Sequence, residues 1–212
     1  MIKKELIKEY KKLLYIIDMV KGFTTEGVMH DSYILNTVPE QLKLIEKFKK
    51  ENEGIAFIKE AHTENAIEFK DFPPHCIIGT SESELIEELK PYEKDALIYP
   101  KNSTSAIFAP NVITDLEEMK NLQLITAAGC CTDICVPNFL IPLKNMFNQY
   151  NRDIDIAVVK GASETYDSPD HNREEYSNMA YKLMKQSGIY VVENTEELEY
   201  LEEKLNKERK IR

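Results

Sequence analysis

Three residues of the types used in nucleophilic catalysis each follow a short apolar run. Asp18 closes the run LLYIID, Lys101 follows DALIYP, and Cys135 lies in GCCTDICVPNF after a third run. An acid, a cation and a thiol are the parts of a base, an orienting group and a nucleophile. Taken singly, Asp18 also fits a helix or turn cap, Lys101 a solvated lysine and Cys135 a buried structural thiol. Their convergence at the ends of three runs favours a catalytic set.

The residues before Cys135 predict the start of a helix. Thr132 and Asp133 are good N-cap types, which would place Cys135 in the first helical turn. A helix N-terminus lowers the pKa of a thiol, and a nearby lysine would lower it further. A nearby carboxylate would also be able to take the thiol proton. The sequence therefore predicts an activated Cys135.

A second group of ionisable residues lies between positions 60 and 75, namely Glu60, His62, Glu68 and His75. The spacing of Glu60 and His62 points both side chains the same way from an extended segment, because side chains alternate along a strand. Two carboxylates and two imidazoles suit Zn²⁺, Fe²⁺ or Mn²⁺, with positions left open for water or substrate. Solvated loops contain the same residue types, so spacing alone leaves both interpretations open.

Six short apolar runs alternate with longer charged segments of helical periodicity. The runs are 13–17, 55–58, 96–99, 122–128, 154–159 and 189–192, and helical spacing occurs in 32–50, 138–150, 173–185 and 195–207. Runs that are apolar on consecutive positions are typical of strands covered on both faces. The alternation predicts a three-layer α/β/α fold in one domain, 1–212, doubly wound around a mainly parallel six-stranded sheet. Ligands bind such sheets beyond the carboxyl ends of the strands, where the candidate residues lie.

Charge and composition exclude several classes of protein. The 212 residues carry 27 Lys plus Arg against 37 Asp plus Glu, a net charge of −10, which disfavours binding to nucleic acid or to an anionic membrane. Charged residues from Lys8 to Lys12 interrupt the N-terminal apolar block, so we expect a cytoplasmic protein without a secretory signal. Three of the four cysteines fall within six positions, which suits a catalytic or metal-binding role better than a disulfide framework.

Four motifs occur in order along the chain. They are IIDMVKGF with Asp18 and Phe23, KEAH followed by FPPHCIIGT at 72–80, PKNSTSAIF at 100–108 and GCCTDICV at 129–136. The combination of PPHC-x-x-GT with TD-x-CV resembles the isochorismatase-like cysteine hydrolases, and within them the nicotinamidases. The resemblance covers nearly the whole chain. It departs from the usual pattern at Glu60 (usually Asp), Phe72 (usually Trp) and Cys131 (usually Ala).

The resemblance implies a catalytic triad of Asp18, Lys101 and Cys135. Asp18 would accept the thiol proton, and Cys135 would attack an amide carbonyl to form a thioester that water then hydrolyses. The family has a non-proline cis peptide before the residue that matches Cys131. The backbone N–H groups of Cys131 and Cys135 would form the oxyanion hole.

The resemblance also implies a divalent metal, zinc first and iron or manganese otherwise. Its ligands would be Glu60, His62 and His75, with Glu68 at the position of a fourth. In nicotinamidases the metal meets the pyridine nitrogen, and Phe23 and Phe72 are candidates for the walls around the ring. The activity implied is conversion of nicotinamide to nicotinate and ammonia for NAD salvage, in a homo-oligomer without nucleic-acid or membrane partners.

The same residues also allow functions other than nicotinamide hydrolysis. Isochorismatases cleave a vinyl ether and lack the nucleophile, so Cys135 argues against that activity. Amidases for ureido or carbamoyl substrates keep the triad but generally lack the full metal set, and they become the better interpretation if Glu60 binds no metal. A redox protein built on a disulfide between Cys130 and Cys131, and a non-catalytic binding module, are weaker alternatives. We expect Cys130 to serve packing and His171 to be an exposed loop histidine.

Overall fold

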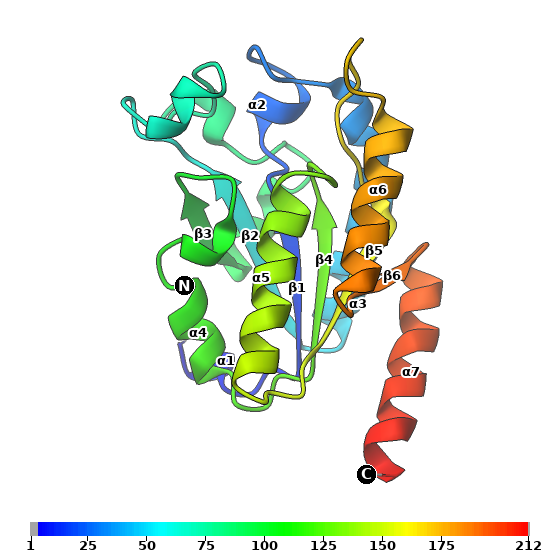
Figure 1. The fold of residues 1–212 in the computed structure, drawn as a ribbon. Helices are drawn as coiled ribbons and strands as arrows, with labels where there is room; N and C mark the ends of the chain where they lie inside the picture. The colour runs from blue at the N-terminus through cyan, green and yellow to red at the C-terminus, as the bar shows by residue number, and fades with distance from the viewer. Residues whose placement is uncertain (1–3, 212) are drawn as a thin grey trace.

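The six apolar runs form one parallel sheet in the computed structural model, which describes residues 4–211 (Figure 1). The strands are β1 (Lys12–Ile17), β2 (Gly54–Glu60), β3 (Leu97–Lys101), β4 (Leu124–Gly129), β5 (Asp155–Ser163) and β6 (Tyr190–Val192). Their order is β3-β2-β1-β4-β5-β6, and each neighbouring pair is parallel. The predicted doubly wound α/β fold is confirmed. β5 runs beyond its predicted end because Ser163 pairs with Gly129 after a shift in register.

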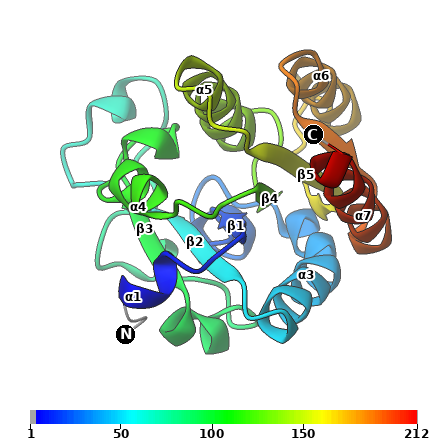
Figure 2. The same cartoon turned by 90° about the horizontal axis from the view of Figure 1, so that it is seen from below.

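Helices cover both faces of the sheet (Figure 2). One core packs the sheet against α4 (Val112–Glu118), α5 (Cys135–Gln149) and α6 (Arg173–Gln186), and the other packs it against α3 (Val38–Lys50) and α7 (Thr195–Ile211). Two helices, α1 (Lys4–Ile7) and α2 (Lys21–Thr24), are single turns, and 3₁₀ turns occupy Ser32–Thr37, Ile67–Lys70, Ser81–Ser83, Lys90–Asp95 and Ala106–Phe108. Within 4–211 no helix is long and apolar enough to cross a membrane.

The helix predicted over 32–50 is divided into two parts. Ser32–Thr37 is a 3₁₀ turn, and α3 begins at Val38. Asp31 stabilises the turn by accepting a 2.9 Å hydrogen bond from the Tyr33 N–H. Pro39 lies in the first turn of α3, where its missing N–H costs no intrahelical bond. The division lets residues 31–37 lie over the sheet edge while α3 packs on its face.

The sheet order places the predicted site residues together. Strand succession changes direction between β1 and β4, and such a switch point leaves a crevice at the carboxyl ends of the strands. Asp18 follows β1, Glu60 and Lys101 end β2 and β3, and the segment before α5 follows β4. In Figure 1 these ends share the upper edge of the sheet, below α2 and its neighbouring loops.

Gly129 permits an unusually close approach between β4 and β1. Its φ is +118°, and a Cβ atom there would lie 2.0 Å from the carbonyl oxygen of Ile17. The N–H of Cys130 then donates to that same carbonyl at 2.9 Å. Only glycine fits both the backbone angle and the space. The contact brings the segment before α5 against Asp18.

Candidate active site

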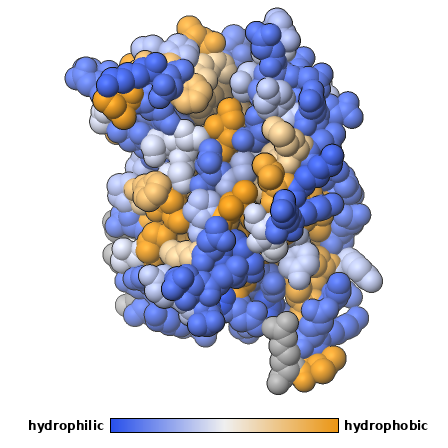
Figure 3. All heavy atoms as spheres, viewed as in Figure 1, coloured by the Kyte–Doolittle hydropathy of each residue, from blue (hydrophilic) through white to orange (hydrophobic). Residues whose placement is uncertain are grey.

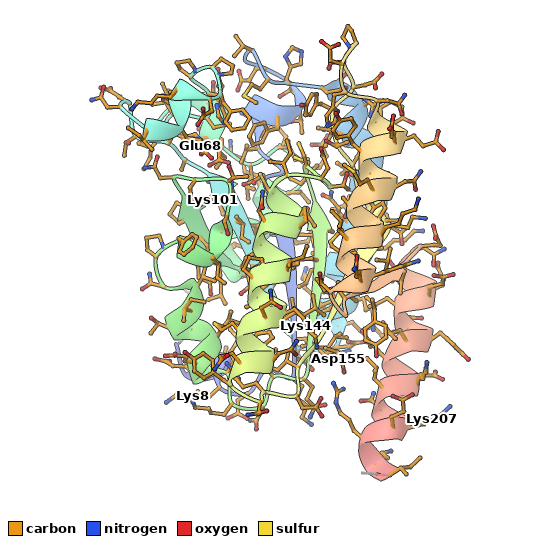
Figure 4. The ribbon with its side chains drawn as sticks, in the orientation of Figure 1. Lys8, Glu68, Lys101, Lys144, Asp155 and Lys207 are labelled. Atoms are coloured by element: carbon orange, nitrogen blue, oxygen red, sulfur yellow. The ribbon has the colours of Figure 1, made fainter. Side chains whose placement is uncertain are left out.

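Asp18, Lys101 and Cys135 meet at the carboxyl edge of the sheet. The Lys101 Nζ lies 3.0 Å from Asp18 Oδ2 and 3.7 Å from Cys135 Sγ. All three side chains are buried, and Lys101 is only 1% exposed. Figure 4 shows Lys101 near the upper end of the sheet, with Glu68 just beyond it. The structure thus brings the three predicted residues within reach of one another.

Burial controls the protonation of this group. It raises the pKa of the Cys135 thiol well above its ordinary value, although Lys101 acts in the opposite direction. Burial also raises the pKa of Asp18, against the lowering effect of Lys101. One lysine faces two carboxylates, Asp18 and Glu60, so a thiolate would add a further negative charge. The predicted lowering of the thiol pKa by Lys101 is present, but burial outweighs it, so the net shift is upward rather than downward. A carboxylate oxygen of Asp18 lies within 4.8 Å of the Cys135 sulfur, close to the proton it would accept.

The start of α5 also differs from the prediction. The helix begins at Cys135 as expected, but neither Thr132 nor Asp133 caps it. Asp133 instead lies 2.7 Å from His171 Nε2, and Thr132 shares a hydrogen bond with Ser177. His171 is 7% exposed, so the prediction of an exposed loop histidine is wrong as well. Both candidate caps bond to tertiary partners, His171 after β5 and Ser177 on α6, rather than to the start of α5.

The backbone between β4 and α5 is arranged around Cys131. The peptide bond between Cys130 and Cys131 is cis, as the resemblance implies. The Cys131 carbonyl accepts hydrogen bonds from the N–H groups of Ile134 and Val136. Cys135 is the first residue of α5, a position whose N–H has no acceptor within the helix. The four cysteines are free thiols, and Cys130 is fully buried and donates to the Asp18 carbonyl at 3.1 Å, in agreement with a packing role.

Glu60, His62 and His75 form a buried cluster whose ligand atoms lie within 4.8 Å of one another. His62 Nε2 is 3.2 Å from Glu60 Oε1 and 3.6 Å from Glu68 Oε2. Glu68 accepts a 3.0 Å hydrogen bond from the N–H of Thr104 through its other oxygen. The four predicted ligands therefore lie together.

Hydrogen bonds fix which nitrogen each histidine offers. The Asn102 Oδ1 accepts from the Thr63 N–H at 3.0 Å, so it must also be the acceptor for His62 Nδ1 at 3.2 Å. His75 Nδ1 lies 2.8 Å from the Pro73 carbonyl, another acceptor. Both Nδ1 atoms therefore carry a hydrogen, and a neutral imidazole at either position offers the lone pair of Nε2. Metal-ligating histidines are oriented by such outer contacts.

The cluster fits a divalent cation. His62 Nε2 and Glu60 Oε1 are buried without a hydrogen-bond partner and face each other at 3.2 Å. Burial raises the pKa of Glu60 to about 8, against the opposing effect of Lys101, while burial lowers the pKa of His62. A cation would stabilise the carboxylate and satisfy both lone pairs at once.

A cavity of about 550 Å³ opens over both groups. Its lining includes Cys135, Glu60 and His75 together with the rings of Phe23, Phe72 and Tyr166. The Phe23 and Phe72 rings lie 5.4 Å and 6.5 Å from the His75 ring. Figure 3 shows apolar residues exposed among hydrophilic ones near the upper end of the molecule. The size and lining suit a small, flat, mostly apolar molecule with one polar reacting group.

Sequence reasoning missed two residues that hold the side chains of the cluster. Asn102 orients His62, and Thr104 holds Glu68. Asn102 directly follows Lys101 at a strand end, a position that offers a signal of its own. The segment after β5 borders the cavity through Tyr166, Asp167 and Ser168.

Comparisons with known proteins agree with this geometry. The sequence profile of the isochorismatase domain matches residues 12–196. Nicotinamidase 1 of Arabidopsis thaliana is 31% identical over 198 residues, covering 84% of this chain and 80% of its own. The crystal structure of nicotinamidase PncA from Bacillus subtilis is 27% identical with a TM-score of 0.68, over 86% of this chain and 99% of that one. The structure of pyrazinamidase from Pyrococcus horikoshii in complex with zinc, 21% identical, shares the fold with a TM-score of 0.67 over 86% of this chain and 99% of its own.

Proposed function

Because the chain belongs to the isochorismatase family, we propose that it is a metal-dependent cysteine amidohydrolase that converts nicotinamide to nicotinate and ammonia. The observation that carries the proposal is the shared cavity, which holds a thiol beside a buried base and, next to them, a cluster suited to a metal. The nicotinamidase relatives support this choice of amide. The product nicotinate would enter NAD salvage. A homo-oligomer and a cytoplasmic location remain predictions.

The first half of the proposed reaction forms a thioester. Asp18 takes the proton of Cys135 as the sulfur attacks the amide carbonyl, so a C–S bond forms and the carbonyl oxygen becomes negative. The N–H groups of Cys131 and Cys135 would stabilise that oxygen. Lys101 stabilises the carboxylate before the proton moves. Asp18 then returns the proton to the amine, the C–N bond breaks, and ammonia leaves.

The second half hydrolyses the thioester. Asp18 removes a proton from a water molecule whose oxygen attacks the thioester carbonyl. The same N–H groups stabilise the new oxyanion. The C–S bond breaks, and the sulfur leaves as the Cys135 thiol after Asp18 returns the proton. Nicotinic acid is released and ionises, and the enzyme regains its starting state.

Glu60, His62 and His75 would hold the metal, with Glu68 as an additional ligand. When bound, the metal supplies a Lewis-acid contact for the pyridine nitrogen, which orients the ring. The zinc-bound pyrazinamidase supports zinc as the first choice. Phe23 and Phe72 would then contact the ring faces and exclude water from the cavity.

A second candidate is an amidase for ureido or carbamoyl substrates. The observation in its favour is that Glu60, which replaces the usual Asp, pairs with Lys101 through one oxygen. If that ion pair keeps Glu60 from binding metal, a substrate without a metal-binding ring nitrogen fits better.

The test is ammonia release from nicotinamide by purified protein, before and after chelation and after readdition of Zn²⁺, Fe²⁺ or Mn²⁺. Metal-dependent release supports the proposal. Release from ureido or carbamoyl compounds alone, with no effect of metal, contradicts it and favours the second candidate.

Two variants separate the parts of the site. Cys135→Ala should abolish turnover while leaving the circular dichroism spectrum and the metal content unchanged. His75→Ala should lower the bound metal measured by elemental analysis and leave the thiol in place. Turnover near the wild-type rate in Cys135→Ala would exclude the covalent mechanism.

A further inference from the structure

His171 is buried in the segment that follows β5, between two tyrosine rings. Its ring centroid lies 3.9 Å from that of Tyr166 and 3.9 Å from that of Tyr176. The Tyr166 ring is nearly parallel to it, at 9°, and the Tyr176 ring is tilted by 31°. The two tyrosines thus cover the imidazole faces, so the ring nitrogens must make its polar contacts.

Both ring nitrogens of His171 face acceptors. Nε2 lies 2.7 Å from Asp133 Oδ2, and Nδ1 lies 3.1 Å from the Tyr166 carbonyl oxygen. An ionised carboxylate and a carbonyl have no hydrogen to donate, so a ring that bonds to both does so through two N–H groups. The carboxylate and the two tyrosine faces are the surroundings that stabilise a buried cation.

The two partners of His171 belong to different parts of the site. Asp133 lies between Cys131 and Cys135, in the segment that carries the nucleophile. Tyr166 lines the cavity. His171 closes the hairpin below Tyr166 through two backbone hydrogen bonds with Ser168, of 3.0 and 3.1 Å. The imidazole therefore joins the cavity wall to the nucleophile segment.

We propose that His171, as an imidazolium, is a positioning residue for the active site. By holding Asp133, it keeps residues 131–135 in the arrangement that aligns the Cys135 sulfur and the neighbouring N–H groups with the carbonyl of a bound amide. It acts through Asp133 and does not touch the reacting atoms. The kinetic consequence rests on the proposed amidohydrolase function, whereas the charge of His171 and its contacts do not.

Kinetics of matched variants test the positioning role. His171→Phe keeps a ring between the tyrosines but removes both donors, and we expect kcat to fall about tenfold or more with KM changed by less than about twofold. Asp133→Asn retains a hydrogen bond, because its amide can donate to a neutral imidazole, and should keep kcat within about threefold of the wild type. The control is Arg209→Met, which removes the guanidinium paired with Asp155 at the opposite edge of the sheet and should leave kcat unchanged.

Nuclear magnetic resonance tests the charge without reference to activity. Long-range ¹H–¹⁵N spectra near neutral pH should show protons on both ring nitrogens of His171. That signal should be absent from His171→Phe and should change to a singly protonated ring in Asp133→Asn. Four histidines in the chain make this assignment practicable.

The outcomes are distinct. A singly protonated His171 in the wild type, or a kcat of His171→Phe equal to that of Arg209→Met, overturns the inference.

If the wild type releases ammonia from no amide, the proposed function fails. The rate at which iodoacetamide alkylates Cys135, measured by mass spectrometry, then replaces kcat. It should be slower in His171→Phe than in Arg209→Met, because the thiol moves away from its base, and equal rates would refute the positioning role.

Discussion

Lys101 contacts three acidic groups at once. It pairs with Asp18 at 3.0 Å and with Glu60, and it lies 3.7 Å from the Cys135 sulfur. These contacts raise the pKa of Lys101 well above its ordinary value against the opposing effect of burial, so it stays charged. A fixed buried cation favours the ionised form of Asp18, which is the form that can accept a proton. In the proposed mechanism, Lys101 therefore favours the carboxylate form of Asp18 that accepts the proton, while burial favours the protonated thiol of Cys135.

The raised pKa of Asp18 predicts the acid limb of the rate profile. In the proposed mechanism the Asp18 carboxylate is the base, so kcat/KM should be lost as pH falls through the pKa of Asp18, above the ordinary aspartate value of about 3.9. Initial rates of ammonia release from about pH 4 to pH 9 give the profile. Metal content is measured at each pH, and only the range in which it is constant is used. An acid limb at or below the ordinary aspartate value would contradict the prediction.

Asn102 should increase the affinity for the metal without being a ligand. Asn102→Leu removes the acceptor that holds His62 Nδ1, so His62 loses its fixed orientation. We expect the Kd for zinc to rise about 10- to 100-fold, measured by competition with a chromogenic chelator. Asn121→Leu, at an exposed contact with the Lys8 carbonyl, is the matched control. Equal affinities of the two variants would show that the Asn102 contact has no part in metal binding.

At the scale of elements, the end of β4 positions the chemistry. β4 ends at Gly129, and α5 begins at Cys135, so the five residues 130–134 carry the chain from the sheet to Cys135. That connection is held by Ile17 on β1 and by the segment after β5, where the Thr132 N–H donates to the Glu164 carbonyl at 3.1 Å. The nucleophile is therefore positioned by neighbours on both sides of β4.

The contact between β4 and β1 predicts a large cost for Gly129→Ala. The added Cβ would lie 2.0 Å from the Ile17 carbonyl oxygen, so two paired strands would have to separate. We expect a loss of about 3 kcal/mol or more in the free energy of unfolding, measured by urea denaturation. Gly79→Ala is the control, because its φ is also positive, at +83°, but nothing lies within 4 Å of the added Cβ. It should cost about 1–2 kcal/mol from backbone strain alone, and equal losses would show that the close approach is unimportant.

At the scale of the whole molecule, the candidate metal site joins separate parts of the chain. Glu60 ends β2, while Glu68 and His75 lie in the long connection before β3. From beyond β3, Thr104 bonds to Glu68 and Asn102 bonds to His62. Such a site forms only when the chain folds, so a metal bound there stabilises the folded state.

Removal of the metal should therefore lower the thermal stability of the whole protein. At a free metal concentration of about 100 times the Kd, the contribution is about 2.7 kcal/mol, which corresponds to a Tm difference of about 5–10 °C. Differential scanning calorimetry with and without chelator measures it. His75→Ala should show no effect of the chelator, and an identical Tm for the wild type in both conditions would contradict a structural contribution of the metal.

The amino-acid sequence by itself determined the sheet and the identity of the clustered residues. Consecutive apolar residues specify strands buried on both faces, and parallel strands bring their carboxyl ends to one edge. Asp18, Glu60, Lys101 and Cys135 follow such strands, so their meeting is a consequence of local pattern and chain order. The motifs resembling a known family added the metal set and the cis peptide, which spacing alone left open.

Tertiary structure alone decided protonation, orientation and the use of His171. The thiol pKa depends on burial and on one lysine shared by two carboxylates, neither of which a local helix start reveals. Asp133 and His171, 38 positions apart, pair across the fold, so Asp133 serves as a partner rather than as a cap. Local pattern predicts which residues stand at an edge. The charge state and neighbours of each side chain depend on atoms from distant segments, which only the folded chain brings into contact.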